Sequence, residues 1–172
     1  MPARHILVIG TFLISLLLYI DRACISVAKD DIVGTFFAGL SEDDQKKLFG
    51  WIGSIFTLGY ALGQTPSGML ADKFGPRRVL ASVIGIWSLF TAMTGAAFNF
   101  LSMMVTRFLF GVGEAGAFPS LARATFSWFP TRERGTVTGI NFSASRLGGA
   151  LAYPLMVWLI AWLGWRGAFF AL

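Results

Sequence analysis

Five ionisable side chains lie inside stretches of the chain that are otherwise apolar enough to span a membrane: Asp21, Arg22, Arg107, Glu114 and Arg146. A charge at the centre of a bilayer costs about 2.5–3.5 kcal/mol even on lenient insertion scales. Such residues therefore face the interior of a helix bundle, pair with one another and mark an ion or substrate pathway. A purely structural set of ion pairs is the alternative, but we expect a transport pathway.

The composition supports a membrane protein. Hydrophobic residues make up 55% of the chain and charged residues 13%, whereas an average soluble domain has about 25% charged residues. We therefore predict an all-α polytopic membrane protein rather than a soluble enzyme. The sequence contains no recognisable nucleophile–base pair or cluster of metal ligands, so we expect neither enzymatic activity nor a cofactor. The net charge of +5 does not indicate a nucleic-acid partner here, because the basic residues gather at the ends of apolar segments.

Five apolar segments are each long enough for the ~20 residues that cross about 30 Å of hydrocarbon. We predict spans at about 6–28, 48–71, 79–98, 101–126 and 135–163, a polar outer loop at 29–47, and a sixth span that starts at 167. The fifth span is expected to end in an interfacial cluster of Trp158, Trp162 and Trp165, as aromatic belts do. Because the sixth span is cut short at residue 172, we expect 1–172 to be the N-terminal transmembrane half of a longer protein.

Basic residues in the short loops predict the orientation. One set of loops is rich in Lys and Arg: Arg4, Lys73, Arg77, Arg78, Arg132 and Arg134. The opposite set mixes basic residues with five acids, and Ser41 is expected there as the N-cap of the second span, with acids in its first turn. Because cytoplasmic loops carry the excess of Lys and Arg, we expect a multi-pass protein of the plasma membrane with a cytoplasmic N-terminus.

The intramembrane charges should converge. At 1.5 Å per residue, Asp21 and Arg22 lie ~10 Å below the outer surface, and Arg107 lies at a similar depth. Glu114 is two turns further along the same face as Arg107, near the middle of the membrane, and Arg146 is also near the middle. These side chains can therefore meet at one site.

Two further spans carry polar side chains at helical spacing. Gly53, Thr57, Tyr60 and Gln64 form one stripe of the second span, which suits a polyhydroxylated ligand or, equally, hydrogen bonds between helices. Asn141 and Ser145 form a similar pair in the fifth span, where Gly148 and Gly149 would permit close helix approach. Gly59 and Gly63 form a GxxxG motif that we interpret as packing.

The segment between the second and third spans carries a charged pattern, with Gly68, Asp72, Lys73, Gly75, Arg77 and Arg78 in order. The two glycines would allow a sharp turn, and the acid followed by three bases would form a compact charged latch. The pattern resembles the loop signature of the major facilitator superfamily, Gly-x-Leu-Ala-Asp-Arg-x-Gly-x-Arg-Arg, with Lys73 in place of an Arg. The fourth span is similar to the proton-coupling motif of the same superfamily, with Arg107, Gly111, Gly113 and Ala115 at the matching places.

Further motifs are similar to those of the anion:cation symporter family, which includes hexuronate, galactonate, glucarate and phthalate permeases. They are Tyr19-Ile-Asp-Arg22, the run from Arg107 to Pro119, the run from Trp128 to Gly135, and Gly164-Trp-Arg166. The fifth span lacks the Gly-Pro-x-x-Gly-Gly element of drug/proton antiporters, which argues against an exporter of that type. The resemblance implies the N-terminal six-helix half of a twelve-helix fold, truncated within helix 6.

The resemblance also implies roles for individual residues. Arg22 would bind the substrate carboxylate, with Tyr19 and Tyr60 on substrate hydroxyls. Asp21 and Glu114 would carry protons, and Arg107 would pair with one of them. The other substrate-binding residues are expected to be Gln64, Asn141, Ser145 and Arg146. Arg146 could be a second carboxylate anchor, implying a dicarboxylate, or a structural partner of Glu114.

The implied function is import of an organic anion, such as a sugar acid, by proton symport with alternating access. Burial favours the protonated form of a carboxylate and a nearby guanidinium favours the ionised form, so a substrate anion that occupies an arginine would promote proton uptake. The coupling ion could also be Na⁺. The resemblance implies a bacterial inner-membrane protein whose complete chain is expected to be a monomer. The alternatives are a facilitative carrier of the same superfamily and a non-transporting membrane sensor or assembly subunit.

Overall fold

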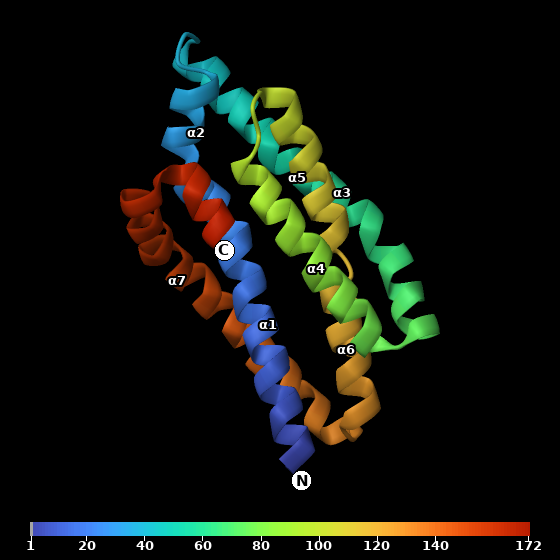
Figure 1. Cartoon of the computed structure of the whole chain (residues 1–172). Helices are drawn as coiled ribbons and strands as arrows, with labels where there is room; N and C mark the ends of the chain where they lie inside the picture. The colour runs from blue at the N-terminus through green and yellow to red at the C-terminus, as the bar shows by residue number, and fades with distance from the viewer. Residues whose placement is uncertain (1) are drawn as a thin grey trace.

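The computed structural model describes residues 2–172, and this part of the chain is all helical (Figure 1). The helices are α1 (Pro2–Val27), α2 (Lys29–Phe36), α3 (Glu42–Phe74), α4 (Pro76–Gly95), α5 (Phe100–Glu114), α6 (Ala117–Trp128) and α7 (Thr131–Ala171). The structure confirms the predicted all-α fold. Three of these helices are long and apolar enough to cross a membrane by length and composition, namely α1 from Ala3, α4 and α7.

The helices pack in two groups that α4 connects. α1 packs mainly against α7, α3 packs mainly against α5, and α4 contacts both α5 and α7. The N-terminus and the turns α3–α4 and α6–α7 lie toward the lower part of the bundle, whereas α2 and the α4–α5 turn lie at the top (Figure 1). The Arg22 side chain of α1 joins the two groups, because it contacts Glu114 of α5 and the Tyr60 ring of α3.

The α3 helix begins and ends at residues whose chemistry explains its bounds. The Ser41 hydroxyl accepts a hydrogen bond from the backbone N–H of Asp44 (3.3 Å), which confirms the predicted N-cap. The helix continues to Phe74, and Gly75 then adopts φ +83°, a conformation that side-chain-bearing residues rarely adopt. Gly68 lies inside α3, so the prediction that it helps to form the turn is wrong: the turn depends on Gly75.

The segment expected to be a polar loop at 29–47 contains the short helix α2 and the first turn of α3. Ile32 of α2 and Phe37 after it are buried, so this segment is anchored by apolar side chains. Trp165 is buried beside it and donates a hydrogen bond from Nε1 to Thr35 Oγ1 (3.1 Å). Trp165 therefore does not belong to an exposed tryptophan cluster, although Trp158 and Trp162 are both exposed.

Two predicted spans contain breaks in the helix. The span predicted at 101–126 consists of α5 and α6, which are separated at Ala115 and Gly116. In α7 the helix is kinked at Gly164 (φ 68°, ψ 167°), so a new helical segment follows this residue rather than starting at 167. Glu114 is thus the last residue of α5, next to a break, and not in the middle of a continuous helix.

Glycines bring two helix pairs into close contact. A methyl group on Gly59 would collide with the Phe108 carbonyl oxygen of α5, and one on Gly63 would lie 2.8 Å from the Ala115 side chain. On α7, a methyl group on Gly148 would collide with the Leu16 carbonyl of α1, whereas Gly149 has no neighbour within 4 Å. The structure therefore supports a packing role for Gly59, Gly63 and Gly148, and the prediction for Gly149 is wrong.

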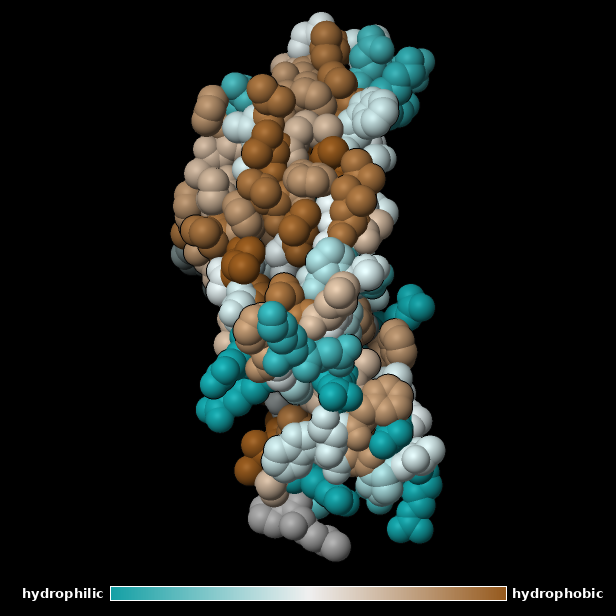
Figure 2. Space-filling view, turned by 90° about the vertical axis from the view of Figure 1, so that its right-hand side faces the viewer, coloured by the Kyte–Doolittle hydropathy of each residue, from teal (hydrophilic) through white to brown (hydrophobic). Residues whose placement is uncertain are grey.

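The surface carries a hydrophobic region of the kind that lipid would cover. Figure 2 shows apolar side chains over the upper part of one face and hydrophilic side chains gathered toward the end that carries the N-terminus. Large apolar side chains are exposed on every long helix, for example Leu13, Leu62, Leu89 and Trp158. In a bilayer these side chains would contact acyl chains rather than water.

Candidate functional site

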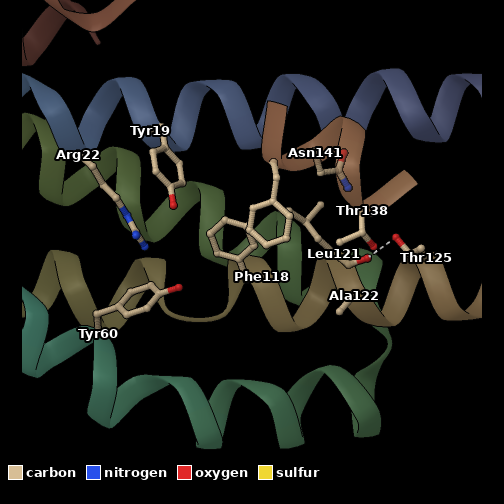
Figure 3. Close-up of a pocket in the computed structure, with 10 residues that line it drawn as sticks. Tyr19, Arg22, Tyr60, Phe118, Leu121, Ala122, Thr125, Thr138 and Asn141 are labelled. Atoms are coloured by element: carbon tan, nitrogen blue, oxygen red, sulfur yellow. Dashed lines mark hydrogen bonds between the residues drawn. The ribbon is translucent and has the colours of Figure 1, made fainter. Parts of the chain in front are cut away.

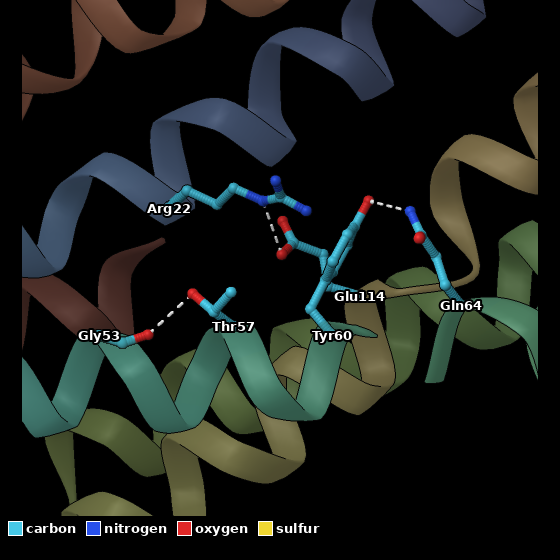
Figure 4. A network of polar contacts seen from close by, with 6 residues as sticks. All are labelled: Arg22, Gly53, Thr57, Tyr60, Gln64 and Glu114. Carbon is cyan, nitrogen blue, oxygen red and sulfur yellow. Dashed lines mark hydrogen bonds and ion pairs between the residues drawn. The ribbon is translucent and has the colours of Figure 1, made fainter. Parts of the chain in front are cut away.

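A buried ion pair connects α1 to the end of α5. Arg22 Nε donates a hydrogen bond to Glu114 Oε2 at 2.8 Å (Figure 4). The Glu114 side chain is 1% exposed and the Arg22 side chain 21% exposed. The other Glu114 oxygen, Oε1, and Arg22 Nη2 are buried and have no hydrogen-bond partner within residues 2–172. The pair is therefore incompletely satisfied and retains a free donor and a free acceptor.

Aromatic rings surround the Arg22 guanidinium. Its central carbon lies 4.3 Å from the Tyr60 ring centroid and 5.4 Å from the centroids of both Tyr19 and Phe56. These distances are within the range of cation–π attraction. The rings hold the guanidinium in place, and its Nη2 makes no hydrogen bond within residues 2–172. Tyr19 and Tyr60 were predicted from the sequence, but Phe56 was not. Its position four residues before Tyr60 on α3 was the available signal.

Arg107 and Asp21 are two further charged residues of this region, and both are buried. The Arg107 guanidinium carbon lies 4.5 Å from the Phe110 ring centroid and 5.2 Å from that of Phe56. Asp21 and Glu114 are both near enough to interact with Arg107 through space. Among the described residues, however, Arg107 makes no direct ion pair, and it is Arg22 that pairs with Glu114. Of the five charges predicted to converge, Asp21, Arg22, Arg107 and Glu114 do so. The prediction is wrong for Arg146, which is exposed on α7.

A cavity of about 330 Å³ opens beside Arg22. It is lined by residues of α1, α3, α6 and α7: Tyr19, Arg22, Tyr60, Phe118, Leu121, Ala122, Thr125, Thr138, Asn141 and Phe142. Figure 3 shows the guanidinium and the two tyrosine hydroxyls at one end, Phe118 in the middle, and the polar groups of Thr138 and Asn141 at the other end. The volume is at the lower end of the range for small-molecule sites. The arrangement suits a small anion with polar groups at its far end.

A second cavity, of about 560 Å³, lies against Arg22 from another direction. Its lining includes Arg107, Phe56 and Thr57 in addition to Arg22. Arg22 is the residue that the two linings share. An anion held by Arg22 would thus be in contact with both spaces.

The remaining predicted residues of α3 and α7 lie at different distances from this site. Gln64 is exposed and donates a hydrogen bond to the Tyr60 hydroxyl (3.3 Å; Figure 4), so it acts on the cavity through Tyr60. Asn141 lines the cavity, and its Oδ1 is buried without a hydrogen-bond partner in the described chain. Ser145 is buried and donates to the Asn141 carbonyl (3.1 Å) rather than lining the cavity. Thr57 likewise donates to the backbone, at Gly53 (3.1 Å).

Arg146 lies apart from the other charges. It is exposed on α7 and pairs with no acid among residues 2–172. Because Glu114 is paired with Arg22, the structure gives no support to Arg146 as its structural partner. Arg146 is therefore not part of the buried charged site.

The charged latch at the α3–α4 turn has a different partner from the one expected. Asp72 Oδ1 lies 3.3 Å from Arg123 Nε of α6, and both side chains are at least half exposed. Arg77 and Arg78, which follow Gly75, are on α4 and make no ion pair in the part of the chain that the structure describes. Arg123 was missed by the sequence analysis, although it is a further charge within the predicted span 101–126 and could have been noticed for that reason.

Comparison with known proteins identifies relatives over almost the whole chain. The family profile described as Major Facilitator Superfamily matches residues 11–172. A probable sulfoacetate transporter of Cupriavidus necator is 41% identical over 98% of this chain and 38% of its own length. A probable galactarate/D-glucarate transporter of Escherichia coli K12 is 35% identical over 98% of this chain and 37% of its own length. The chain therefore spans little more than a third of the length of these curated relatives.

The solved structures agree on the fold. A bacterial homologue of the human lysosomal transporter Spinster, in an inward-facing and unoccupied conformation, superimposes with a TM-score of 0.85 at 29% identity. The match covers 95% of this chain and 33% of that one. The inward-open xylose transporter XylE of Escherichia coli superimposes with a TM-score of 0.80 at 21% identity, over 95% of this chain and 44% of that one, which shows likeness of fold alone.

Proposed function

Because this chain belongs to the major facilitator superfamily, we propose that it forms the substrate-binding N-terminal half of a secondary active transporter that imports an organic anion by proton symport. The family is one of transporters and not of enzymes, and the fold is that of the N-terminal six-helix half. The remaining part of the transport site would come from a second half, in keeping with the share of its relatives that this chain covers.

The observation that carries the proposal is the position of Arg22. Its guanidinium lines the cavity, is held between aromatic rings, and keeps Nη2 free of hydrogen bonds within the described residues. A planar guanidinium binds a carboxylate through two parallel N–H donors, a geometry that few other side chains can provide. An anion that binds at this end of the cavity can therefore contact the Arg22 guanidinium.

Competition for Arg22 would couple the anion to a proton. In the structure Arg22 neutralises the buried Glu114. When a substrate carboxylate draws the guanidinium into the cavity, Glu114 is left as a buried carboxylate with a weakened partner. A buried charge without a partner is strongly unfavourable, so Glu114 would take up a proton. Asp21 would be a second proton carrier on the same path, and Arg107 would be the nearby cation that favours its ionised form.

The substrate class follows from the two ends of the cavity and from the relatives. Tyr19, Tyr60 and Asn141 offer hydrogen bonds to hydroxyl groups of an anion whose carboxylate is on Arg22. The relatives named above are described as carriers of sulfoacetate, galactarate and D-glucarate, each of which has two acidic groups. We propose a small sugar acid or a related carboxylate. Arg146 does not line this cavity, so a second acidic group of the same anion would bind at Thr138 and Asn141 or at residues of the second half.

Alternating access would use the two spaces that Arg22 borders. Rocking of this half against the other half about a central site exposes the substrate to one side of the membrane at a time. The Asp72–Arg123 ion pair at the cytoplasmic end would stabilise one of the two states. The basic residues at this end also support a cytoplasmic N-terminus and a location in the bacterial inner membrane.

The test is uptake of labelled anions by proteoliposomes that contain the product of the complete gene. Sulfoacetate, glucarate, galactarate, galactonate and a hexuronate would be compared, with and without an imposed pH gradient. We expect accumulation that depends on the pH gradient, and the same uptake is measured with a Na⁺ gradient for comparison. Flux that depends on neither gradient would instead indicate a facilitative carrier. Binding without flux would indicate a non-transporting sensor or assembly subunit.

A further inference from the structure

A groove separate from the anion cavity runs along the bundle between α3 and α4. It has a volume of about 490 Å³ and shares no lining residue with the anion cavity. α3 and α4 diverge from the turn at Gly75 (Figure 1), and both pack on α5 more extensively than on each other. Leu109 and Val112 of α5 therefore form the floor of the groove.

The lining is apolar along most of its length and basic at one end. Leu70 and Phe74 of α3 face Ile86 and Phe90 of α4 across the groove, and each of the first three is more than 40% exposed. Arg78 lines the end next to the turn, and it makes no ion pair among residues 2–172. Lys73 and Arg77, in the same turn, are also exposed. A basic group at the mouth of an apolar groove is complementary to an amphiphile with an anionic head and a hydrocarbon tail.

The length of the groove matches one leaflet of a membrane. Arg78 and Phe90 are three turns of helix apart, or about 18 Å at 1.5 Å per residue. One leaflet contributes about half of the ~30 Å hydrocarbon core. The basic loops predict that Arg78 lies at the cytoplasmic surface, where anionic lipids attract basic side chains and basic pockets between helices bind their head groups.

We propose that this groove is a binding site for an anionic glycerophospholipid of the cytoplasmic leaflet, with its phosphate on Arg78 and one acyl chain between α3 and α4. The lipid would brace the two helices on either side of the Gly75 turn. The site requires the predicted orientation of the bundle but not the proposed anion transport, so the two proposals can fail separately.

Native mass spectrometry of the full chain in detergent tests the head-group specificity. The chain would be titrated with phosphatidylglycerol and with phosphatidylethanolamine that carry identical acyl chains. We expect tighter binding of phosphatidylglycerol, and a loss of about fivefold in its affinity in Arg78→Gln, which corresponds to ~1 kcal/mol for one basic residue at the surface. Arg132→Gln, which removes an exposed charge at the start of α7, is the matched control and should change neither lipid.

A second pair of variants tests the groove itself. Ser82 lines the groove, whereas its neighbour Ala81 is exposed on α4 outside the lining. Ser82→Phe should fill the groove and lower the affinity for both lipids several-fold, whereas Ala81→Phe should change neither affinity. If Ser82→Phe does not fold, Ser82→Leu is the smaller substitution. Equal binding of the two lipids to the unaltered chain, or equal losses in Arg78→Gln and Arg132→Gln, would overturn the proposal. Unchanged binding in the Ser82 variants would also overturn it, because the lipid would then bind outside the groove.

Discussion

Two ion pairs in this molecule differ in almost every respect that decides their energy. Arg22–Glu114 is buried between α1 and α5 at 2.8 Å, whereas Asp72–Arg123 lies near the α3–α4 turn at 3.3 Å with both side chains at least half exposed. Removing one member of a buried pair leaves an uncompensated charge and costs about 3–5 kcal/mol. An exposed pair contributes about 0–1 kcal/mol. The buried pair is therefore suited to couple binding to protonation, and the exposed pair to adjust a balance between conformations.

The largest effect is expected from Arg22→Ala. This variant removes the anion anchor and the partner of Glu114 at once. A hydrogen bond to a charged group contributes about 1.5–3 kcal/mol, so we expect anion affinity to fall by ~10- to 100-fold in equilibrium binding. Arg22→Lys keeps the charge but not the planar fork, so its anion affinity should lie between those of the unaltered protein and Arg22→Ala. An unchanged affinity in Arg22→Ala would remove Arg22 from the binding site.

Glu114→Gln separates binding from coupling. The amide keeps the shape of the side chain but cannot take up a proton, so accumulation driven by a pH gradient should be lost while substrate exchange is retained. Uptake and counterflow in proteoliposomes measure the two activities. Glu133→Gln is the matched control, because Glu133 forms a surface pair with Arg4 at 3.9 Å. Normal accumulation by Glu114→Gln would refute the coupling role.

Gly59→Ala tests whether the buried site depends on the close approach of α3 and α5. The new methyl group would collide with the Phe108 carbonyl, and overpacking of this kind costs about 1–3 kcal/mol. We expect a lower midpoint of thermal unfolding in detergent. Gly53→Ala, on the same helix with no neighbour within 4 Å, should leave the midpoint unchanged or raise it, since alanine favours helix by up to ~1 kcal/mol. Equal midpoints for the two variants would show that this contact contributes nothing.

The smallest effect is expected from Asp72→Asn. Loss of an exposed pair should change the turnover rate by up to about fivefold, or ~1 kcal/mol, with little change in substrate affinity. Arg123→Gln should produce the same change, and the double variant should add little to either single one. Uptake rates measured over a range of substrate concentrations distinguish the two parameters. A loss confined to affinity would contradict the role of a latch.

For the residues of these two ion pairs, some features could be predicted from the sequence and others could not. Charges within apolar segments are visible as a pattern of residue types, so the convergence of Asp21, Arg22, Arg107 and Glu114 was predicted correctly. Arg146 was wrongly expected to join them, because depth along a helix does not tell which way its side chain faces. Their pairing was not, because it depends on how α1 and α5 are rotated about their axes. The ion pair of Asp72 with Arg123 was missed for a similar reason: the two residues lie 51 positions apart and on different helices.

Helix breaks and the burial of an aromatic residue were also not predicted from the sequence. Hydropathy identifies 101–126 as one apolar segment, but it does not register the change of direction at Ala115 and Gly116 that ends α5 at Glu114. Trp165 resembles an interfacial tryptophan in sequence, yet it is buried because Thr35 and Phe36 of α2 provide a hydrogen bond and an aromatic contact. Tertiary partners from distant parts of the chain determine both outcomes.

Proton uptake on anion binding tests the central claim most directly. The purified protein would be mixed with the transported anion in weakly buffered detergent solution that contains a pH indicator. The exchange of Arg22 from Glu114 to the substrate predicts uptake of a proton for each anion bound, and none in Glu114→Gln at a saturating anion concentration. Anion binding without proton uptake, or equal uptake by the two proteins, would contradict the account.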